Sequence, residues 1–227
     1  MGSISFFDVW FVFVAIGLVF FVVGIVRRRK RRDALAVWAP TKGWRYVAED
    51  NSLVNRFQGF PFGRGSSRRA RNVILGYHDG RHLVAFDYQY TTSTGSGSSR
   101  NTSSHYHSVL ALHVGHPMPP LEVSPRSVVG AFIGRLTGSD LELGSPEFTR
   151  TFRVKADSPR FAADVLQPQM TQLLLTQPDT GWRFDGDSLV VVRKGQQSIE
   201  DIETTLVHLD AILDAVPADV WRAIRGQ

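Results

Sequence analysis

The sequence predicts an α+β fold, with one N-terminal transmembrane helix followed by a soluble domain that combines a mainly antiparallel sheet with packing helices. Residues 9–26 form an apolar run without a charge, and six consecutive cations follow it. Residues 70–115 alternate apolar and polar side chains around an Asp-Gly turn, which is typical of antiparallel strands. Two later segments, which start at Ser158 and Ser198, repeat apolar residues at helical spacing.

The apolar run is long enough to cross a bilayer. Its 18 residues, at about 1.5 Å of helical rise each, approach the ~30 Å thickness of a hydrocarbon core. A cleaved signal peptide is disfavoured, because it would carry its cations before the apolar run. Here the cations come after the run, as Arg27, Arg28, Arg29, Lys30, Arg31 and Arg32. Since the side richer in Lys and Arg stays in the cytoplasm, we expect a single-pass protein of the cell (inner) membrane with its N-terminus outside and its C-terminal domain in the cytoplasm.

This pattern divides the chain into four regions. Residues 1–8 are expected to be a short extracytoplasmic N-terminus, and residues 9–26 the transmembrane helix. Residues 27–42 form a basic juxtamembrane segment and linker, and residues 43–227 a single soluble α+β domain. Within that domain, residues 91–104 read TTSTGSGSSRNTSS, which predicts a mobile polar loop.

The positive charge of the chain is concentrated beside the apolar run. The formal net charge is +5, from 26 Lys and Arg against 21 Asp and Glu. Without the six cations at 27–32 and the acidic Asp8, 20 charges of each sign remain, so the domain itself is neutral. A neutral domain argues against nucleic acid as a partner, because that function needs a basic face. The absence of cysteine excludes disulfides and thiolate chemistry.

A hairpin is predicted around the Asp79-Gly80 turn. Pairing outward from this turn sets Leu75 opposite Val84 and Val73 opposite Phe86 on one apolar face.

A third strand is expected over residues 105–114. In this register Asp87 lies opposite Val109, and the even-numbered residues, among them Leu110 and Leu112, join the apolar face of the hairpin.

Three histidines of this strand are weak candidates for a metal site. His105, His107 and His113 share the odd-numbered, outer face, with Gln89 opposite His107 in the expected register. A histidine pair two residues apart, near a carboxylate, can bind zinc. Solvent-facing polar strand residues explain the same pattern without a metal, and this is the favoured interpretation. We therefore assign no metal, no cofactor and no catalytic residue.

The other elements follow from caps, turns and proline. In order, we expect a strand at 43–47, a short helix capped by Asn51 or Ser52, a helix at 127–136, a strand at 147–156, helices from Ser158 divided at Pro168, a hairpin turning at 185–186, and a helix from Ser198 that ends before Pro217.

The C-terminal part combines a motif over residues 148–174, which includes Asp157-Ser158-Pro159, with a closing segment from Pro217 to Trp221. In these residues the chain resembles an uncharacterised family of bacterial (actinobacterial-type) single-pass membrane-anchored proteins of unknown function. The resemblance covers about the last 80 residues. It implies an anchored α+β domain and supplies no catalytic residues.

We expect a membrane-tethered cytoplasmic binding or adaptor domain that is non-enzymatic. Its expected partners are the lipid bilayer and an unidentified protein at the membrane. One alternative is a membrane-bound hydrolase, possibly metal-dependent, although no Gly-x-Ser-x-Gly motif is present. The other is an anionic-lipid-binding module, since cations beside a membrane attract acidic headgroups. Its lipid contacts would be Arg64, Arg68, Arg69 and Arg71.

Overall fold

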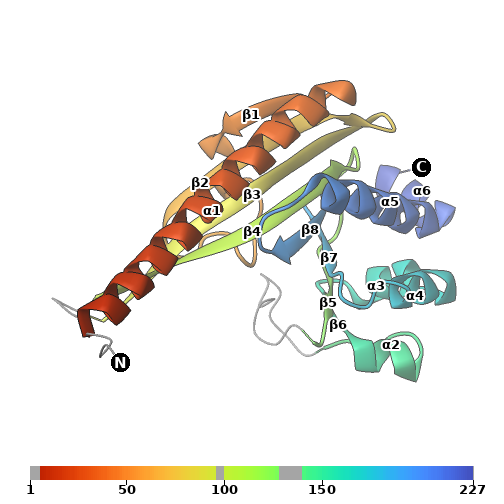
Figure 1. The fold of residues 1–227 in the computed structure, drawn as a ribbon. Coiled ribbons are helices and arrows are strands. Elements are labelled where there is room, and N and C mark those ends of the chain that lie inside the picture. The colour runs from red at the N-terminus through yellow and green to blue at the C-terminus, as the bar shows by residue number, and fades with distance from the viewer. Residues whose placement is uncertain (1–5, 96–99, 128–139, 227) are drawn as a thin grey trace.

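The computed structural model describes residues 6–95, 100–127 and 140–226, and the side chains of residues 6–16 and 21 lie outside this description. Its strands form one eight-stranded sheet in the order β1-β2-β3-β4-β8-β7-β5-β6 (Figure 1). Neighbouring strands are antiparallel throughout this order. The strands are β1 (Arg45–Glu49), β2 (Ser66–His78), β3 (Arg81–Thr94), β4 (Asn101–His113), β5 (Leu121–Pro125), β6 (Phe152–Ala156), β7 (Trp182–Asp185) and β8 (Ser188–Lys194). The predicted α+β class with an antiparallel sheet is confirmed.

The helices gather in two places along this sheet. The long α1 crosses the β1–β4 half, whereas α2, α3 and α4 lie beside β5, β6 and β7, with α5 and α6 next to them (Figure 1). The helices are α1 (Phe6–Thr41), the 3-10 helix η1 (Asn51–Asn55), α2 (Pro146–Thr151), α3 (Pro159–Val165), α4 (Pro168–Leu175), α5 (Ile199–Ala215) and α6 (Ala218–Arg225).

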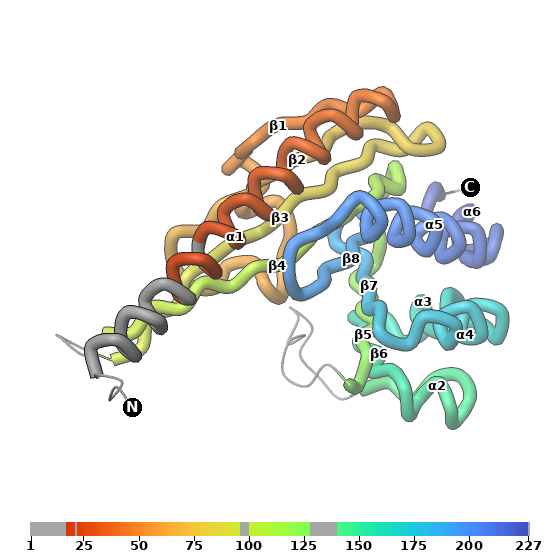
Figure 2. The backbone as a smooth tube through the Cα atoms, viewed as in Figure 1, coloured from red at the N-terminus to blue at the C-terminus, as the bar shows by residue number. Residues whose placement is uncertain are grey.

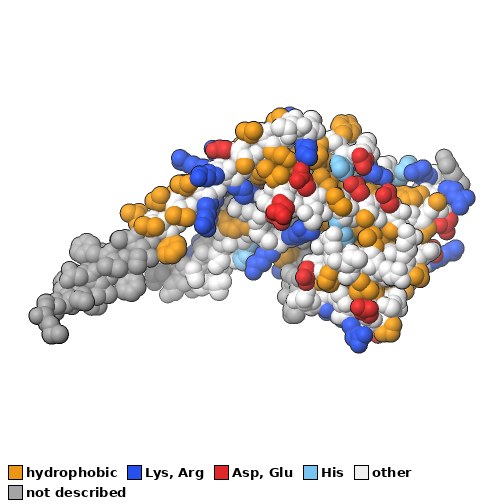
Figure 3. Space-filling model, turned by 45° about the vertical axis from the view of Figure 1, so that its right-hand side comes forward, with side chains coloured by type: hydrophobic (Ala, Val, Ile, Leu, Met, Phe, Trp, Pro, Cys, Tyr) orange, Lys and Arg blue, Asp and Glu red, His pale blue; other side chains and the backbone are white. Residues whose placement is uncertain are grey.

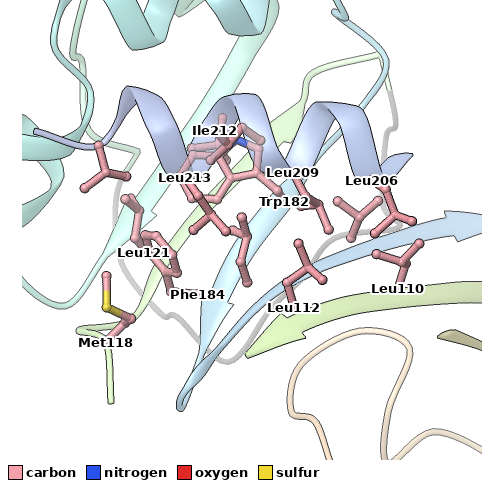
Figure 4. Close-up of a cluster of buried hydrophobic side chains, with 14 of the residues drawn as sticks. Leu110, Leu112, Met118, Leu121, Trp182, Phe184, Leu206, Leu209, Ile212 and Leu213 are labelled. Atoms are coloured by element: carbon pink, nitrogen blue, oxygen red, sulfur yellow. The ribbon is translucent and has the colours of Figure 1, made fainter. Parts of the chain in front are cut away.

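Helix α5 buries an apolar face against the middle of the sheet. Leu209, Ile212 and Leu213 recur at helical spacing and lie over Leu112 and Trp182 (Figure 4). All five side chains are at most 2% exposed. Burying a side chain of this size contributes roughly 1.5–3 kcal/mol relative to leaving it in water, so core packing holds this helix in place.

The opposite face of the sheet is covered by η1 and the loop that follows it. The Phe57 ring stacks on Phe86 with their centroids 6.3 Å apart, and Phe62 meets the edge of Tyr88 at 4.9 Å. These aromatic residues belong to a second buried cluster. The central strands are therefore buried on both faces.

The predicted face of β4 is wrong. Val109 pairs with Phe86, whereas its expected partner was Asp87, the next residue along β3. Leu110 and Leu112 consequently face the helices, while the odd-numbered residues of β4 share the side of Phe86. Because β4 is apolar on both faces, the alternation of its side chains could not indicate which face is which.

The hairpin at Asp79-Gly80 is confirmed near its turn, where Leu75 pairs with Val84. Further out the register shifts between Arg71 and Ile74, so the expected pairing of Val73 with Phe86 is lost. Asn72 lies in this irregular stretch with a φ of +50°, a backbone region that asparagine tolerates better than most residues.

Two further predictions are corrected. The polar loop expected over residues 91–104 is shorter, because β3 continues to Thr94 and β4 begins at Asn101. The strand expected at 147–156 begins as helix α2, which Ser145 caps by accepting a bond from the Phe148 amide. Phe148 and Phe152 are four residues apart, which fits a helical turn as well as an alternating strand.

The start and stop signals are mostly confirmed. Ser158 and Ser198 cap α3 and α5, and α4 starts anew at Pro168. Asp50 caps η1, in place of the expected Asn51 or Ser52. The hairpin predicted at 185–186 joins β7 to β8. Most of the helix expected at 127–136 lies outside the described residues.

Helix α1 continues from the apolar run to Thr41, so it includes nearly all of the segment 27–42 that was expected as a basic juxtamembrane segment and linker. Its described side chains begin at Gly17, where the tube in Figure 2 changes from grey to red. Among the described residues, no helix has the length and apolar character that a membrane crossing requires. The transmembrane span expected at 9–26 stays a prediction, because the side chains of residues 6–16 and 21 lie outside the description.

Close packing of a glycine against a tryptophan joins the turn that follows α1 to β2. Trp44 is 7% exposed, and its Nε1 donates to the Tyr77 carbonyl at 2.8 Å. A Cβ atom built on Gly76 would lie 2.3 Å from Cδ1 of Trp44. The indole therefore occupies the space that any larger residue at position 76 would need.

We expect Gly76→Ala to destabilise the fold by about 1–3 kcal/mol, because the buried indole must shift. The measurement is urea unfolding of the full chain followed by circular dichroism. In a Trp44→Ala background, the same substitution should cost close to nothing, which a double-mutant cycle tests. An equal cost in both backgrounds would contradict the steric explanation.

Candidate functional site

The basic segment of α1 is fixed to the sheet by an ion pair. The Arg31 Nη2 donates to Oδ2 of Asp87 at 2.6 Å, and its Nη1 donates to the Gln197 carbonyl at 2.8 Å. The Asp87 side chain is 2% exposed and that of Arg31 is 21% exposed. A single side chain thus connects α1 to β3 and to the loop before α5.

Asp87 also accepts bonds from two other donors. Asn72 Nδ2 donates to Oδ2 at 2.7 Å, and the Gln197 amide donates to Oδ1 at 3.2 Å. The Tyr46 hydroxyl in turn donates to Oδ1 of Asn72 at 2.8 Å. The irregular register of β2 places Asn72 at this position. A buried carboxylate needs donors of this kind to offset its desolvation.

A cationic groove of about 320 Å³ opens beside this network, between α1 and strands β1 to β4. We use the name cationic groove for the hollow lined by five arginines, namely Arg28, Arg29, Arg31, Arg32 and Arg71. Two carboxylates, Glu49 and Asp87, also line it, so the groove carries three positive charges in excess. Figure 3 shows Lys and Arg side chains gathered where α1 reaches the body of the domain.

The carboxylates of the groove are already engaged. Asp87 is paired with Arg31, and Glu49 accepts from Arg69 at 3.0 Å and from Arg71 at 3.1 Å. Among the described residues, neither Arg28 nor Arg29 forms an ion pair; the Arg28 guanidinium lies 5.8 Å from the centre of the Tyr106 ring. The groove therefore offers guanidinium groups to an incoming anion.

The predicted lipid contacts do not form one patch. Arg71 lines the cationic groove, and Arg69 shares Glu49 with it. Arg64 instead lies over the Phe60 ring, 4.9 Å from its centre, and Arg68 interacts with the Tyr88 hydroxyl. Of the six cations of α1, Arg27 and Lys30 are absent from the groove lining.

The predicted metal candidates lie along one face of β4 but do not converge. The His105 ring stacks on the Tyr90 ring with their centroids 4.7 Å apart, and the buried His107 packs between Tyr90 and Phe60. His113, at the far end of the strand, lies 3.2 Å from Oδ2 of Asp187.

Another group of residues has closer spacing. The ligand atoms of His78, Asp79 and Asp210 lie within 4.8 Å of one another. His78 Nε2 is 2.6 Å from Oδ2 of Asp210, so this pair already has a hydrogen bond that joins β2 to α5.

A buried charge cluster on β5 and β7 has a structural role. Arg183 pairs across the strands with Glu122, donates to the Phe60 carbonyl at 3.0 Å and lies 3.6 Å from Asp185. Burial raises the pKa of Glu122 and lowers the pKa of Arg183. Perturbed groups are common at functional sites, but the cavity here is about 30 Å³. That volume suits a water molecule and not a substrate.

Sequence reasoning missed Asp87 as the centre of the site. Its signal was present, because Asp87 is a single acid between Phe86 and Tyr88 in an otherwise apolar stretch. Such an acid must be either solvated or paired. The partner Arg31 is 56 residues away in the sequence, so spacing could not identify it.

We expect Asp87→Asn to destabilise the protein by about 3–5 kcal/mol, because it removes one partner of a buried pair. Oδ2 accepts two donors, so an amide nitrogen at either oxygen position would face another donor. The matched control is Asp33→Asn, whose pair with Arg32 is exposed at 3.3 Å and should contribute less than about 1 kcal/mol. Denaturant unfolding of both variants checks this, and similar losses would contradict the assigned role.

Acid should weaken the fold through His107. Burial, with the nearby His105 and Lys194, lowers the pKa of His107 from 6.5 to about 4. The folded protein therefore keeps this imidazole neutral where the unfolded chain binds a proton, so the free energy of unfolding should fall as the pH drops from about 7 to 4. We expect His107→Gln to show a shallower slope in unfolding measured across this range. An unchanged slope would contradict the prediction.

No family model and no curated protein match this chain. A search of solved structures finds the crystal structure of the mycobacterial trehalose monomycolate transport factor A, TtfA. The match has a TM-score of 0.59 and 17% sequence identity, and covers 83% of this chain and 95% of that chain. At this identity the similarity establishes a shared fold, and the mycobacterial source agrees with the actinobacterial resemblance of the C-terminal segment.

Proposed function

We propose that this protein is a membrane-tethered accessory module, which binds a membrane protein and does not catalyse a reaction. The fold neighbour is described as a transport factor, which supports an accessory role in a transport process. In this proposal α1 is the tether, its N-terminus lies outside the cell membrane and the sheet domain is cytoplasmic. The cations after residue 26 support this orientation.

The observation that carries the proposal is the exposed apolar surface of α1. Leu18 is 62% exposed, Val19 61% and Phe20 73%, and further exposed valines and an isoleucine continue to Val26. Figure 3 shows a group of hydrophobic side chains next to Lys and Arg side chains where α1 leaves the body of the domain. A continuous apolar surface of this kind is unfavourable in water and marks a contact with a membrane or another protein.

A membrane would restrict where the β3–β4 hairpin can lie in this proposal. The β3–β4 hairpin extends in the same direction as the N-terminal part of α1 (Figure 1). Its described end is rich in hydroxyl groups, and those of Ser93 and Thr102 lie 3.3 Å apart. Because strand edges and polar side chains are disfavoured within hydrocarbon, the hairpin end must stay in the headgroup layer or bend away from α1.

Fractionation of cells tests the tether. We expect the full chain to remain in the membrane pellet at high salt and alkaline pH, and to enter solution with detergent. Protease added to intact spheroplasts should leave the C-terminal domain uncut. Recovery from cytosol without detergent, or loss of the domain to external protease, would overturn the proposal.

Purification from native membranes tests the accessory role. In mild detergent we expect the tagged full chain to co-purify with an integral membrane protein in a constant ratio. Elution of the chain alone, after crosslinking in intact cells, would count against an accessory function.

A further inference from the structure

We propose that the cationic groove binds a phosphate group, presented by the headgroup of an anionic lipid. The identity of the ligand as a lipid rests on the proposed tether, because the tether places the groove beside the membrane. The phosphate chemistry itself rests on the groove alone.

The groove carries an excess of positive charge. The five arginines of the groove exceed its two carboxylates by three charges, and both carboxylates already have arginine partners. Outside residues 27–32 and Asp8, the chain has equal numbers of acidic and basic residues. Four of the six cations of residues 27–32 line this hollow. A planar guanidinium binds a phosphate through two parallel hydrogen bonds, which favours a phosphate over a simple halide.

The volume and the lining of the groove suit a small phosphate-bearing group. Its volume of about 320 Å³ falls in the range of small-molecule sites. Neutral polar side chains, namely Gln89, Gln196 and Tyr106, line it beside the arginines. They can bond to the hydroxyls of a glycerol or sugar attached to the phosphate. The Nε of Arg31, which is buried in the same lining, has no hydrogen-bond partner.

Helical geometry separates the cations of α1 into two groups. At about 100° per residue, Arg28, Arg29, Arg31 and Arg32 fall within an arc of about 160°. Arg27 and Lys30 lie outside this arc, in agreement with their absence from the groove lining. The orientation of a helix in a membrane depends on the number of cations near its end and not on the face they occupy. The lining of a groove, in contrast, depends on which face of the helix carries the cations.

The groove lies just beyond the exposed apolar surface of α1. Val26 is the last residue of the exposed apolar surface, and Arg28 and Arg29 follow within three residues. At about 1.5 Å per residue, these two arginines lie less than about 5 Å beyond that surface along the helix axis. If the apolar surface is in hydrocarbon, the groove opens at the level of the lipid phosphates.

The test uses the purified full chain in neutral detergent. Native mass spectrometry measures bound phosphatidylglycerol against bound phosphatidylcholine, and calorimetry measures binding of glycerol 3-phosphate. The groove variant is R28Q/R29Q. The matched control is R27Q/K30Q, which removes the same charge from the same helical segment. Glutamine is a good helix former, so both variants should keep α1 intact, and circular dichroism verifies this.

We expect R28Q/R29Q to bind phosphatidylglycerol about tenfold more weakly, as the loss of charge-assisted hydrogen bonds implies. R27Q/K30Q should stay within about twofold of the unmodified chain, because its cations do not line the groove. Binding of glycerol 3-phosphate with the same dependence on Arg28 and Arg29, but without a preference for the acidic lipid, would support the phosphate site and identify a soluble ligand as its source.

Two outcomes would overturn the proposal. An equal loss of phosphatidylglycerol binding in both variants would show diffuse attraction to the basic segment. A protein that binds neither phosphatidylglycerol nor glycerol 3-phosphate would exclude the site. The result is independent of the tether, because micelles contain the protein whether or not α1 crosses a membrane in the cell. A cytosolic protein with an intact phosphate site would refute the proposed function alone.

Discussion

The ion pair between Arg31 and Asp87 determines how α1 lies on the sheet, and the cationic groove depends on that position. Each charge costs several kcal/mol to bury, and the pair is favourable only because further hydrogen bonds surround it. Asn72 and the Gln197 amide supply those bonds to Asp87. The network therefore connects α1, β2, β3 and the loop before α5. The arginines beside it repel one another, and the buried pair offsets this repulsion by holding the helix in one orientation.

An irregularity in β2 makes the network possible. Between Arg71 and Ile74 the register of the hairpin shifts, and Asn72 adopts a positive φ. A regular strand would place successive side chains on alternate faces, whereas here Asn72 reaches Asp87 on the side that faces α1. On the other face, Phe86 and its aromatic neighbours close a separate core. The same stretch of sheet thus carries an apolar cluster on one side and a polar site on the other.

Local signals in the sequence were sufficient for much of the fold. The Asp79-Gly80 turn and the caps at Ser158 and Ser198 act through neighbouring residues, so each could be recognised from a few positions. The face of β4 could not, because Val109 and Leu110 are both buried on opposite sides of the sheet. The groove could not be predicted either, since it depends on contacts between α1 and strands far along the chain. What the sequence did contain was the clustering of cations at 27–32 and a lone acid in β3.

The two uses that we propose for the basic segment differ in what they require of α1. Orientation in a membrane requires cations on one side of an apolar run, and a flexible linker after that run would serve as well as a helix. The continuous helix through Thr41 instead transmits the direction of the apolar segment to the sheet. Because Leu35 and Ala39 of α1 are fully buried in the main core and Arg31 binds Asp87, the domain is attached at two points along this helix. Two attachments prevent rotation about either one, so the groove keeps a fixed angle to the helix axis. A rigid connection of this kind is needed to present a binding surface at a defined height above a membrane, and it has no evident use in a domain that is merely tethered.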